Sequence, residues 1–236
     1  MTLFGAYARA LRDVFKPRIL GVLVLPMLGA IVLWTALAWF FWEAWMRPLR
    51  AFLGSGTVAA WFGGYADTFA SGSAALLLFA LVIGSTFVTA IVITELVAMP
   101  VIVSTVEREY PQLAKRGGMN VTGSIVNAVV AVGVFALLWI VTLPLWLTGF
   151  GAVLVPALTS AYLMQRLFRF DALSEHATRD EYREIVSNNG SRLYGLGLAL
   201  APVYYVPFVN LVAPVLSGLA FTHFCLAELE RHRRGP

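Results

Sequence analysis

The residues best suited to bind a small anion lie where two long uncharged stretches are interrupted. The first stretch breaks at a glycine turn, and the second at a segment of proline and asparagine. A helix that begins after such a break has amide N–H groups without intrahelical partners, and it carries the positive end of the helix dipole. In a low-dielectric environment these groups favour an anion. The predicted substrate-binding residues at the two breaks are Thr148, Gly149, Gly151 and Asn210.

Thr148 and Asn210 are predicted to cap the helices that follow the breaks, because a short polar side chain accepts hydrogen bonds from the first free amides. Two helix N-termini directed at the middle of a membrane would hold a dianion without a buried lysine or arginine. The alternative is that each break is a capped turn packed within the protein, since membrane helices are also broken for packing reasons. The sequence leaves both interpretations open.

Two charged residues stand at the ends of the other apolar stretches. Arg18 precedes the uncharged residues 19–42, where its guanidinium would either bind an anion or reach the lipid headgroups as an anchor. Glu95 follows the uncharged residues 71–94. A carboxylate there is equally consistent with an ion or proton site and with the membrane surface.

The sequence predicts neither catalysis nor a cofactor nor a metal site. The three histidines show no metal-ligand spacing with each other or with Cys225, and no strand precedes the glycines at 195 and 197. The formal charge of +4 has no basic cluster with interleaved aromatic residues, so nucleic-acid binding is not predicted. We therefore expect a protein that is not an enzyme.

The composition places these residues in a lipid bilayer. Hydrophobic residues make up 59% of the chain and charged residues 13%, and the mean hydropathy is +0.79. Soluble domains carry about 25% charged residues. The sequence therefore predicts an all-α integral membrane protein, with residues 1–236 forming a single membrane domain.

Four apolar segments are predicted to enter the membrane. Residues 19–42 and 71–106 are expected to cross it fully, joined by a connector with a short surface helix near residues 58–62. Residues 119–167 and 193–227 are expected to form two re-entrant helical hairpins. The second limb of the first hairpin, residues 152–165, would measure roughly 21 Å against a hydrocarbon core of about 30 Å. The short limb favours a half-penetrating hairpin over two full crossings.

The polar segments complete the predicted arrangement. Residues 1–18 form an amphipathic helix that lies in the membrane interface, and residues 172–192 form a cytosolic helix with a capping box and an asparagine–glycine stop. Fifteen of the 17 lysines and arginines then share one side, and the other two are Arg47 and Arg50. The positive-inside rule places both termini in the cytoplasm.

Several short motifs resemble a known family, the CysZ-type sulfate permeases, which are the bacterial branch of the etoposide-induced-protein membrane domain. The resemblance implies two full spans with two half-penetrating hairpins, sulfate uptake in the bacterial inner membrane and assembly into a homo-oligomer. It also makes Arg18 the best candidate for anion binding. The residues that carry it are Pro17–Arg18, Leu25–Pro26, Ala98–Met99–Pro100 with Glu107, Phe170–Asp171, Tyr194–Gly195, Pro207, Asn210, Pro214 and Gly218.

The sequence is consistent with three functions. The first is a permease for a small inorganic anion, with sulfate the best candidate and the lipid bilayer its setting. The second is a membrane-shaping or scaffolding protein without transport, in which half-inserted hairpins act as wedges. The third is proton-coupled exchange through Glu95.

Overall fold

The structure is a computed structural model that describes residues 1–55, 63–117, 121–146, 148–206 and 209–235. Every regular element in these ranges is a helix, which confirms the all-α prediction. The chain divides into two compact units, residues 21–97 and residues 1–20 with 98–236. The predicted surface helix near residues 58–62 and the apex proline Pro207 lie outside the described ranges.

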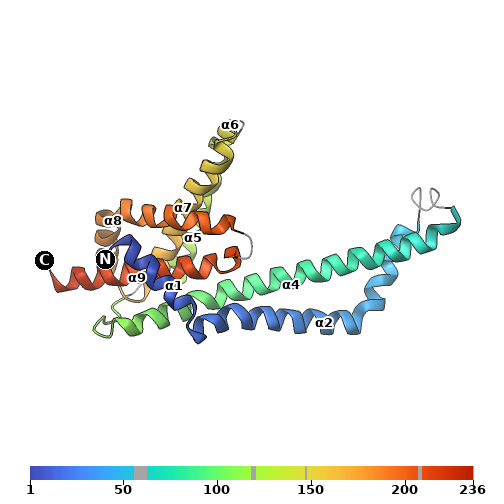
Figure 1. The fold of residues 1–236 in the computed structure, drawn as a ribbon, viewed down its shortest axis with the longest axis horizontal. Helices are drawn as coiled ribbons and strands as arrows, with labels where there is room; N and C mark the ends of the chain where they lie inside the picture. The colour runs from blue at the N-terminus through green and yellow to red at the C-terminus, as the bar shows by residue number, and fades with distance from the viewer. Residues whose placement is uncertain (56–62, 118–120, 147, 207–208, 236) are drawn as a thin grey trace. The chain divides into compact units, whose positions relative to one another are not determined.

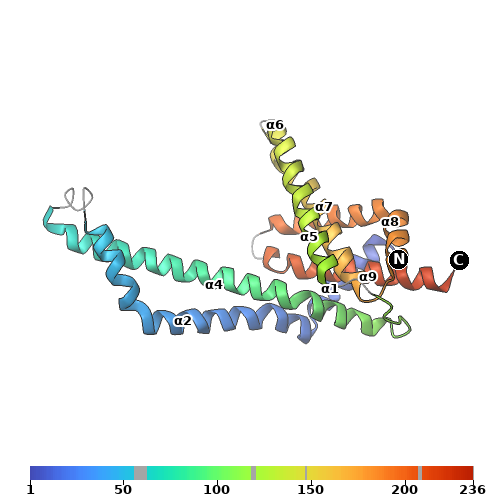
Figure 2. The same cartoon turned by 180° about the vertical axis from the view of Figure 1, so that it is seen from behind.

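The unit of residues 21–97 consists mainly of two long helices. Helix α2 spans Pro17–Leu53 and helix α4 spans Ala66–Val106, with the short 3₁₀-helix η1 at Gly63–Tyr65 between them. Figures 1 and 2 show α2 and α4 lying side by side and antiparallel. Trp34 Nε1 donates a hydrogen bond of 2.9 Å to Thr89 Oγ1 between them. Such a link between helices replaces the water that a membrane does not supply.

Both helices extend past the predicted spans. Helix α2 has 37 residues and α4 has 41, so they measure about 55 Å and about 60 Å, well beyond a hydrocarbon core of about 30 Å. The first span is predicted to end near residue 42, and the helix itself runs on to Leu53. Met46 is buried against Ala74 and Leu78 there, and this contact supports the extension. The end of the membrane-embedded part stays a prediction.

The other unit contains the remaining helices. They are α1 (Leu3–Val14), η2 (Glu107–Glu109), α5 (Val121–Val141), α6 (Leu143–Trp146), α7 (Gly151–Ser174), α8 (Arg179–Leu200), η3 (Ala201–Tyr205), η4 (Val209–Leu211) and α9 (Ala213–Arg234). Helix α9 is the centre of this unit, because it packs against α1, α7 and α8. Every residue from 215 to 226 is buried.

Among the described residues, three helical segments are long and apolar enough to cross a membrane: Pro17–Leu53, Gly63–Glu109 and Gly123–Val141. The third is the first limb of the first predicted hairpin. Its second limb, α7, has 24 residues and continues without a break into the charged residues beyond 165. Only the apolar part of α7, and not the whole helix, is therefore shorter than the hydrocarbon core. Helices α5 and α7 pack along each other, as the hairpin prediction requires (Figure 2).

The predicted asparagine–glycine helix stop falls on a kink. Helix α8 spans Arg179 to Leu200 and consists of two helical parts joined at Asn189, whose φ of −119° and ψ of 16° are not helical. The Asn189 side chain donates to the Ile185 carbonyl oxygen at 3.1 Å. The second part continues through residue 193, where the second hairpin is predicted to begin. Ile185 and Leu193, one on each side of the kink, are both buried.

The capping box at the start of α8 is confirmed. Thr178 Oγ1 accepts from the Glu181 amide at 3.3 Å, and the Glu181 carboxylate accepts from the Thr178 amide at 2.8 Å. Arg233 binds the same carboxylate through two nitrogens, at 2.8 and 3.0 Å. The hydrogen bonds from Arg233 hold the pKa of Glu181 at about 2. The start of α8 and the end of α9 are thereby fastened together.

The predicted amphipathic helix is also present, as α1. Its small residues Ala6 and Ala10 are fully buried against α9. Phe4 and Phe15, on another face, are 82% and 69% exposed. An exposed apolar face beside a buried small-residue face suits a helix that lies between protein and lipid headgroups. Its position in the membrane interface stays a prediction.

Two glycines of α8 provide a matched test of this packing. A methyl group at Gly197 would lie 2.8 Å from the Ala161 carbonyl oxygen of α7, whereas one at Gly195 would meet only a leucine side chain at 3.5 Å. We expect Gly197→Ala to destabilise the protein by about 1–3 kcal/mol, because the backbone of α7 must move. Gly195→Ala should be neutral or stabilising, because alanine favours helix. Thermal unfolding of both variants in detergent checks this, and equal unfolding temperatures would contradict the close approach of α7 and α8.

Candidate functional site

The turn between α6 and α7 satisfies its own polar groups. Thr148 Oγ1 donates to the Leu145 carbonyl oxygen at 2.7 Å and accepts from the Gly151 amide at 3.2 Å. Gly149 has a positive φ of 71°, which glycine adopts readily. A side chain at Gly151 would overlap the Leu145 carbonyl oxygen, so these residues are explained by the turn itself.

The two predicted caps have different outcomes. Thr148 accepts a hydrogen bond from the Gly151 amide, the first of α7, as predicted, although the N-cap position itself is Phe150. Asn210 lies within the 3₁₀-helix η4, and α9 begins later with Val212 at its N-cap position. The predicted N-cap position of Asn210 is therefore wrong.

The other two predicted site residues have different outcomes. Arg18 is exposed in the first turn of α2, and it makes no ion pair with any carboxylate whose position the structure describes. Glu95 lies within α4, but its side chain is outside the described part of the structure. Thr148, Gly149 and Gly151 share one turn, whereas Asn210 and Arg18 lie in separate segments. The prediction of a site at Arg18 stays open.

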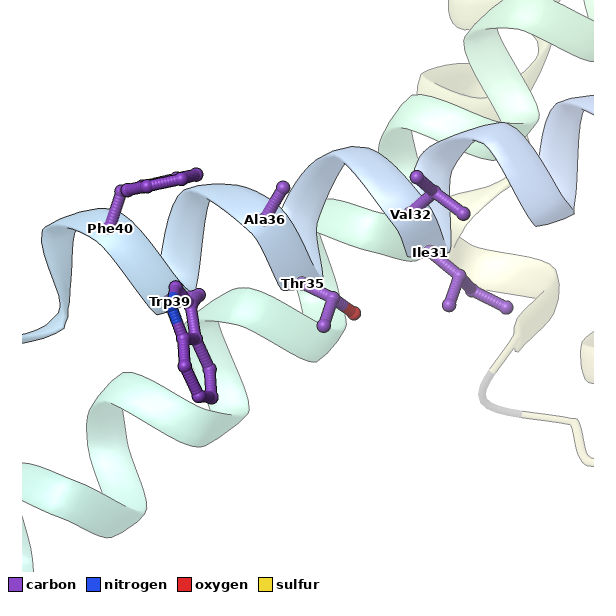
Figure 3. A pocket seen from close by; sticks show the side chains of 6 residues that line it. All are labelled: Ile31, Val32, Thr35, Ala36, Trp39 and Phe40. Atoms are coloured by element: carbon purple, nitrogen blue, oxygen red, sulfur yellow. The ribbon is translucent and has the colours of Figure 1, made fainter.

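Two hollows on the α2–α4 unit are apolar. One of about 500 Å³ lies on α2, and Figure 3 shows that the polar atoms among its lining side chains are the Thr35 hydroxyl and the Trp39 indole nitrogen. Another, of about 490 Å³, lies between Trp34 and α4. Such grooves match lipid chains or another helix better than an anion. The first is lined by Ile31, Val32, Thr35, Ala36, Trp39 and Phe40.

A polar contact inside the α5–α7 hairpin offers stronger anion chemistry. The Arg166 guanidinium donates to Asn127 Oδ1 at 3.4 Å and to the Tyr162 hydroxyl at 2.7 Å. Asn127 in turn donates to the Arg166 carbonyl oxygen at 3.2 Å. Among the described residues, no carboxylate forms an ion pair with Arg166. A guanidinium held by neutral partners keeps its charge available for an oxyanion.

The sequence does not predict this contact, for two reasons. Arg166 directly follows an uncharged stretch, so its position suggests a residue outside the membrane. Asn127 lies 39 residues away on the other limb, and only the pairing of the limbs brings the two together. The signal available in advance was an amide side chain within a segment apolar enough to cross a membrane.

Helix α7 also contains a half-buried aspartate that is hydrogen-bonded by a serine of α5. Asp171 lies near the end of α7, and burial raises its pKa to about 6, although a hydrogen bond from the Ser124 hydroxyl partly opposes the shift. A carboxyl group with this pKa is partly protonated near neutral pH. It is one half of the aromatic–Asp pair that carried the family resemblance.

A second polar cluster is buried where α1 meets α9. The Asp13 side chain is fully buried, and it accepts hydrogen bonds from Lys16 at 2.7 Å, from Arg12 at 3.1 Å and from His223 at 3.1 Å. Burial alone would raise the pKa of Asp13, but these three bonds outweigh it and lower the pKa. Lys16 and Arg12 also bind Glu109 in the turn after α4. The cluster ties three distant segments together.

These features define a membrane protein whose described elements are all helical, and three helical segments of the described ranges are apolar and long enough to cross a bilayer. A comparison with protein families identifies the family of this protein. The chain belongs to the family described as sulfate transporter CysZ/etoposide-induced protein 2.4, whose model matches residues 6–214. The resemblance predicted from the sequence motifs is thereby confirmed. No match was found among curated proteins or among solved structures.

The raised pKa of Asp171 predicts a pH dependence of stability. Because the folded-state pKa exceeds the ordinary value of 3.8, the folded protein binds the proton more tightly than the unfolded chain does. We therefore expect this group to stabilise the protein by about 2–3 kcal/mol below pH 4, and to lose that contribution as the pH rises through about 6. Asp171→Asn, which mimics the protonated form, should unfold at a higher temperature than wild type at pH 7.5 and lack this pH dependence.

Thermal unfolding between pH 4 and 8 measures the difference between wild type and variant. The matched control is Asp180→Asn, because Asp180 lies on the exposed first turn of α8. A difference between Asp171→Asn and wild type that stays constant across this pH range would contradict the assignment.

Proposed function

We propose that this protein is a permease for a small inorganic anion in a bacterial inner membrane, with sulfate as its substrate. Membership of the sulfate transporter family over residues 6–214 is the observation that carries the proposal. No catalytic step and no cofactor are part of it. Both termini are proposed to face the cytoplasm, as the distribution of lysine and arginine predicts.

The proposed arrangement has two full spans, α2 and α4, and two re-entrant hairpins, α5–α7 and α8–α9. Both hairpins fold back on themselves, because α5 packs on α7 and α8 packs on α9. The length of α5, with 21 residues or about 31 Å, would also allow a full crossing. Measuring the accessibility of cysteines introduced along the turn between α6 and α7 decides between the two depths.

The proposed anion contacts are arginines, assisted by the turns at the hairpin apices. Arg18 is exposed without a described carboxylate partner, and Arg166 is held by the neutral side chains of Asn127 and Tyr162. A guanidinium presents a planar fork of N–H donors that fits a tetrahedral oxyanion. The glycine turn keeps Thr148, Gly149 and Gly151 together, but its first helical amide is already bound. The two arginines are therefore proposed to contribute more to sulfate binding than the apex turns do.

The first test is radiolabelled sulfate flux into liposomes that contain the purified protein. We expect Arg18→Gln and Arg166→Gln each to lower the initial rate by about 10- to 100-fold, since a hydrogen bond to a charged group contributes about 1.5–3 kcal/mol. Arg183→Gln is the matched control, because Arg183 is 79% exposed on α8 and its partner Asp180 is 96% exposed. Wild-type flux no faster than that of empty liposomes would refute the permease proposal.

A coupling role for Glu95 is a separate proposal. If Glu95 carries a proton with the anion, Glu95→Gln should abolish the dependence of sulfate flux on the imposed pH gradient while leaving a residual rate. The flux assay at several internal and external pH values measures this. An unchanged pH dependence in the variant would assign Glu95 to the membrane surface.

A membrane-shaping role is the second candidate function. The exposed phenylalanines Phe4 and Phe15 of α1 favour it, because an apolar face inserted into one leaflet acts as a wedge. Vesicle deformation by wild-type protein, in the absence of any anion flux, would support this role over transport.

A further inference from the structure

His223 of α9 has two ring nitrogens in contrasting surroundings. Nε2 lies 3.1 Å from Asp13 Oδ2, which is hydrogen-bonding distance, and the carboxylate can only accept. Nε2 therefore carries the hydrogen. Nδ1 is buried without a hydrogen-bond partner among the described residues, and the imidazole has no solvent exposure. A buried polar atom without a partner is costly and calls for a physical explanation.

A carboxylate oxygen lies near this nitrogen, just beyond hydrogen-bonding distance. Glu109 Oε2 lies 4.0 Å from His223 Nδ1, too far for a hydrogen bond. The two atoms also repel, because a deprotonated Nδ1 and a carboxylate oxygen both present lone pairs. In a tetrahedral site, a zinc–nitrogen bond of about 2.0–2.1 Å and a zinc–oxygen bond of about 2.0–2.2 Å place the two ligand atoms about 3.3–3.5 Å apart. The Glu109 side chain, which is 27% exposed, would have to move toward His223 by about 0.6 Å to reach that separation.

The cations around Glu109 leave this oxygen available. Arg12 and Lys16 both bind Oε1, at 2.8 and 3.0 Å, and no described hydrogen bond occupies Oε2. Their side chains are 64% and 35% exposed, so both can move toward solvent and relieve repulsion from another cation. Asp13, Glu109 and His223 each offer a ligand atom, and these atoms lie within 4.8 Å of one another.

We propose that a transition-metal dication of the zinc type binds between His223 Nδ1 and Glu109 Oε2. Asp13 holds the imidazole through Nε2–H, which fixes the tautomer and makes Nδ1 a better ligand, as carboxylates beside metal-bound histidines do. Water completes the coordination on the exposed side of Glu109. The ion would connect α1, the turn after α4 and α9. This role does not depend on the proposed anion path.

A second buried histidine of the same unit provides the contrast. His176 Nε2 lies 3.2 Å from Glu107 Oε2, so these two atoms already pair with each other. Lys115 binds the same oxygen at 2.9 Å. His176 therefore resembles His223 in burial and in facing a glutamate of the same turn, but the oxygen that it faces is already bound by a lysine. It serves as the matched control position.

The experiment uses the full-length protein in detergent, stripped with a chelator and then titrated with zinc chloride. Bound zinc is measured by elemental analysis after gel filtration, and stability by thermal unfolding. We expect one zinc per chain and a higher unfolding temperature for wild type and for His176→Gln. His223→Gln and Glu109→Gln should bind zinc at least 10-fold more weakly. Asp13→Asn, which leaves both ligands in place, should weaken binding by about 10- to 100-fold.

Cobalt(II) titration supplies a readout that does not depend on folding stability, because coordination by nitrogen and oxygen produces a visible absorption band. A band in wild type that is lost in His223→Gln supports the site. Zinc retention equal in wild type and His223→Gln would overturn the proposal. A second result would also overturn it: metal-free wild type becomes more stable on acidification, and His223→Gln does not. A proton on Nδ1 would then lie between His223 and Glu109 in place of a metal ion. Neither result depends on whether the protein transports sulfate.

Discussion

The burial of α9 from residue 215 to residue 226 is the constraint on which the larger unit of this protein depends. This part of the helix packs among α1, α7 and α8 and has no face left for water, so each of its polar groups needs a protein partner. Thr222 bonds within the helix to the Gly218 carbonyl oxygen, and His223 bonds to Asp13 of α1. A side chain at Gly218 would press against Ile102 near the end of α4. Burial of α9 thus determines where α1 and the end of α4 can lie.

The α5–α7 hairpin follows a related rule in an apolar environment. Polar side chains pair across it at three levels: Trp139 with Thr159, Asn127 with Arg166, and Ser124 with Asp171. Where water is scarce, each such pair satisfies groups that would otherwise be costly to bury. The pairs fix the register of the two helices. They also leave Arg166 charged and without a described carboxylate partner, which is why it ranks above the apex turns as an anion contact.

Local sequence rules were reliable where the interaction is local. The capping box of Thr178 and Glu181 and the amphipathic helix α1 follow from residues three or four positions apart, and both are present. The asparagine–glycine stop is present as a kink at Asn189, and helical structure resumes after it beside the buried Leu193. The same rules misjudged Asn210, where a 3₁₀ turn delays the start of α9.

The sequence by itself determined the class of this protein, its helical content and its family, because hydropathy, helix signals and short motifs are readable residue by residue. Only the tertiary structure decided which polar groups meet. Asp13 and His223 are 210 positions apart, and Asn127 and Arg166 are 39 apart. Neither spacing has a periodicity that predicts contact. These pairs arise because helices with satisfied backbones still have to satisfy their buried side chains, and only the packing of whole helices determines the partners.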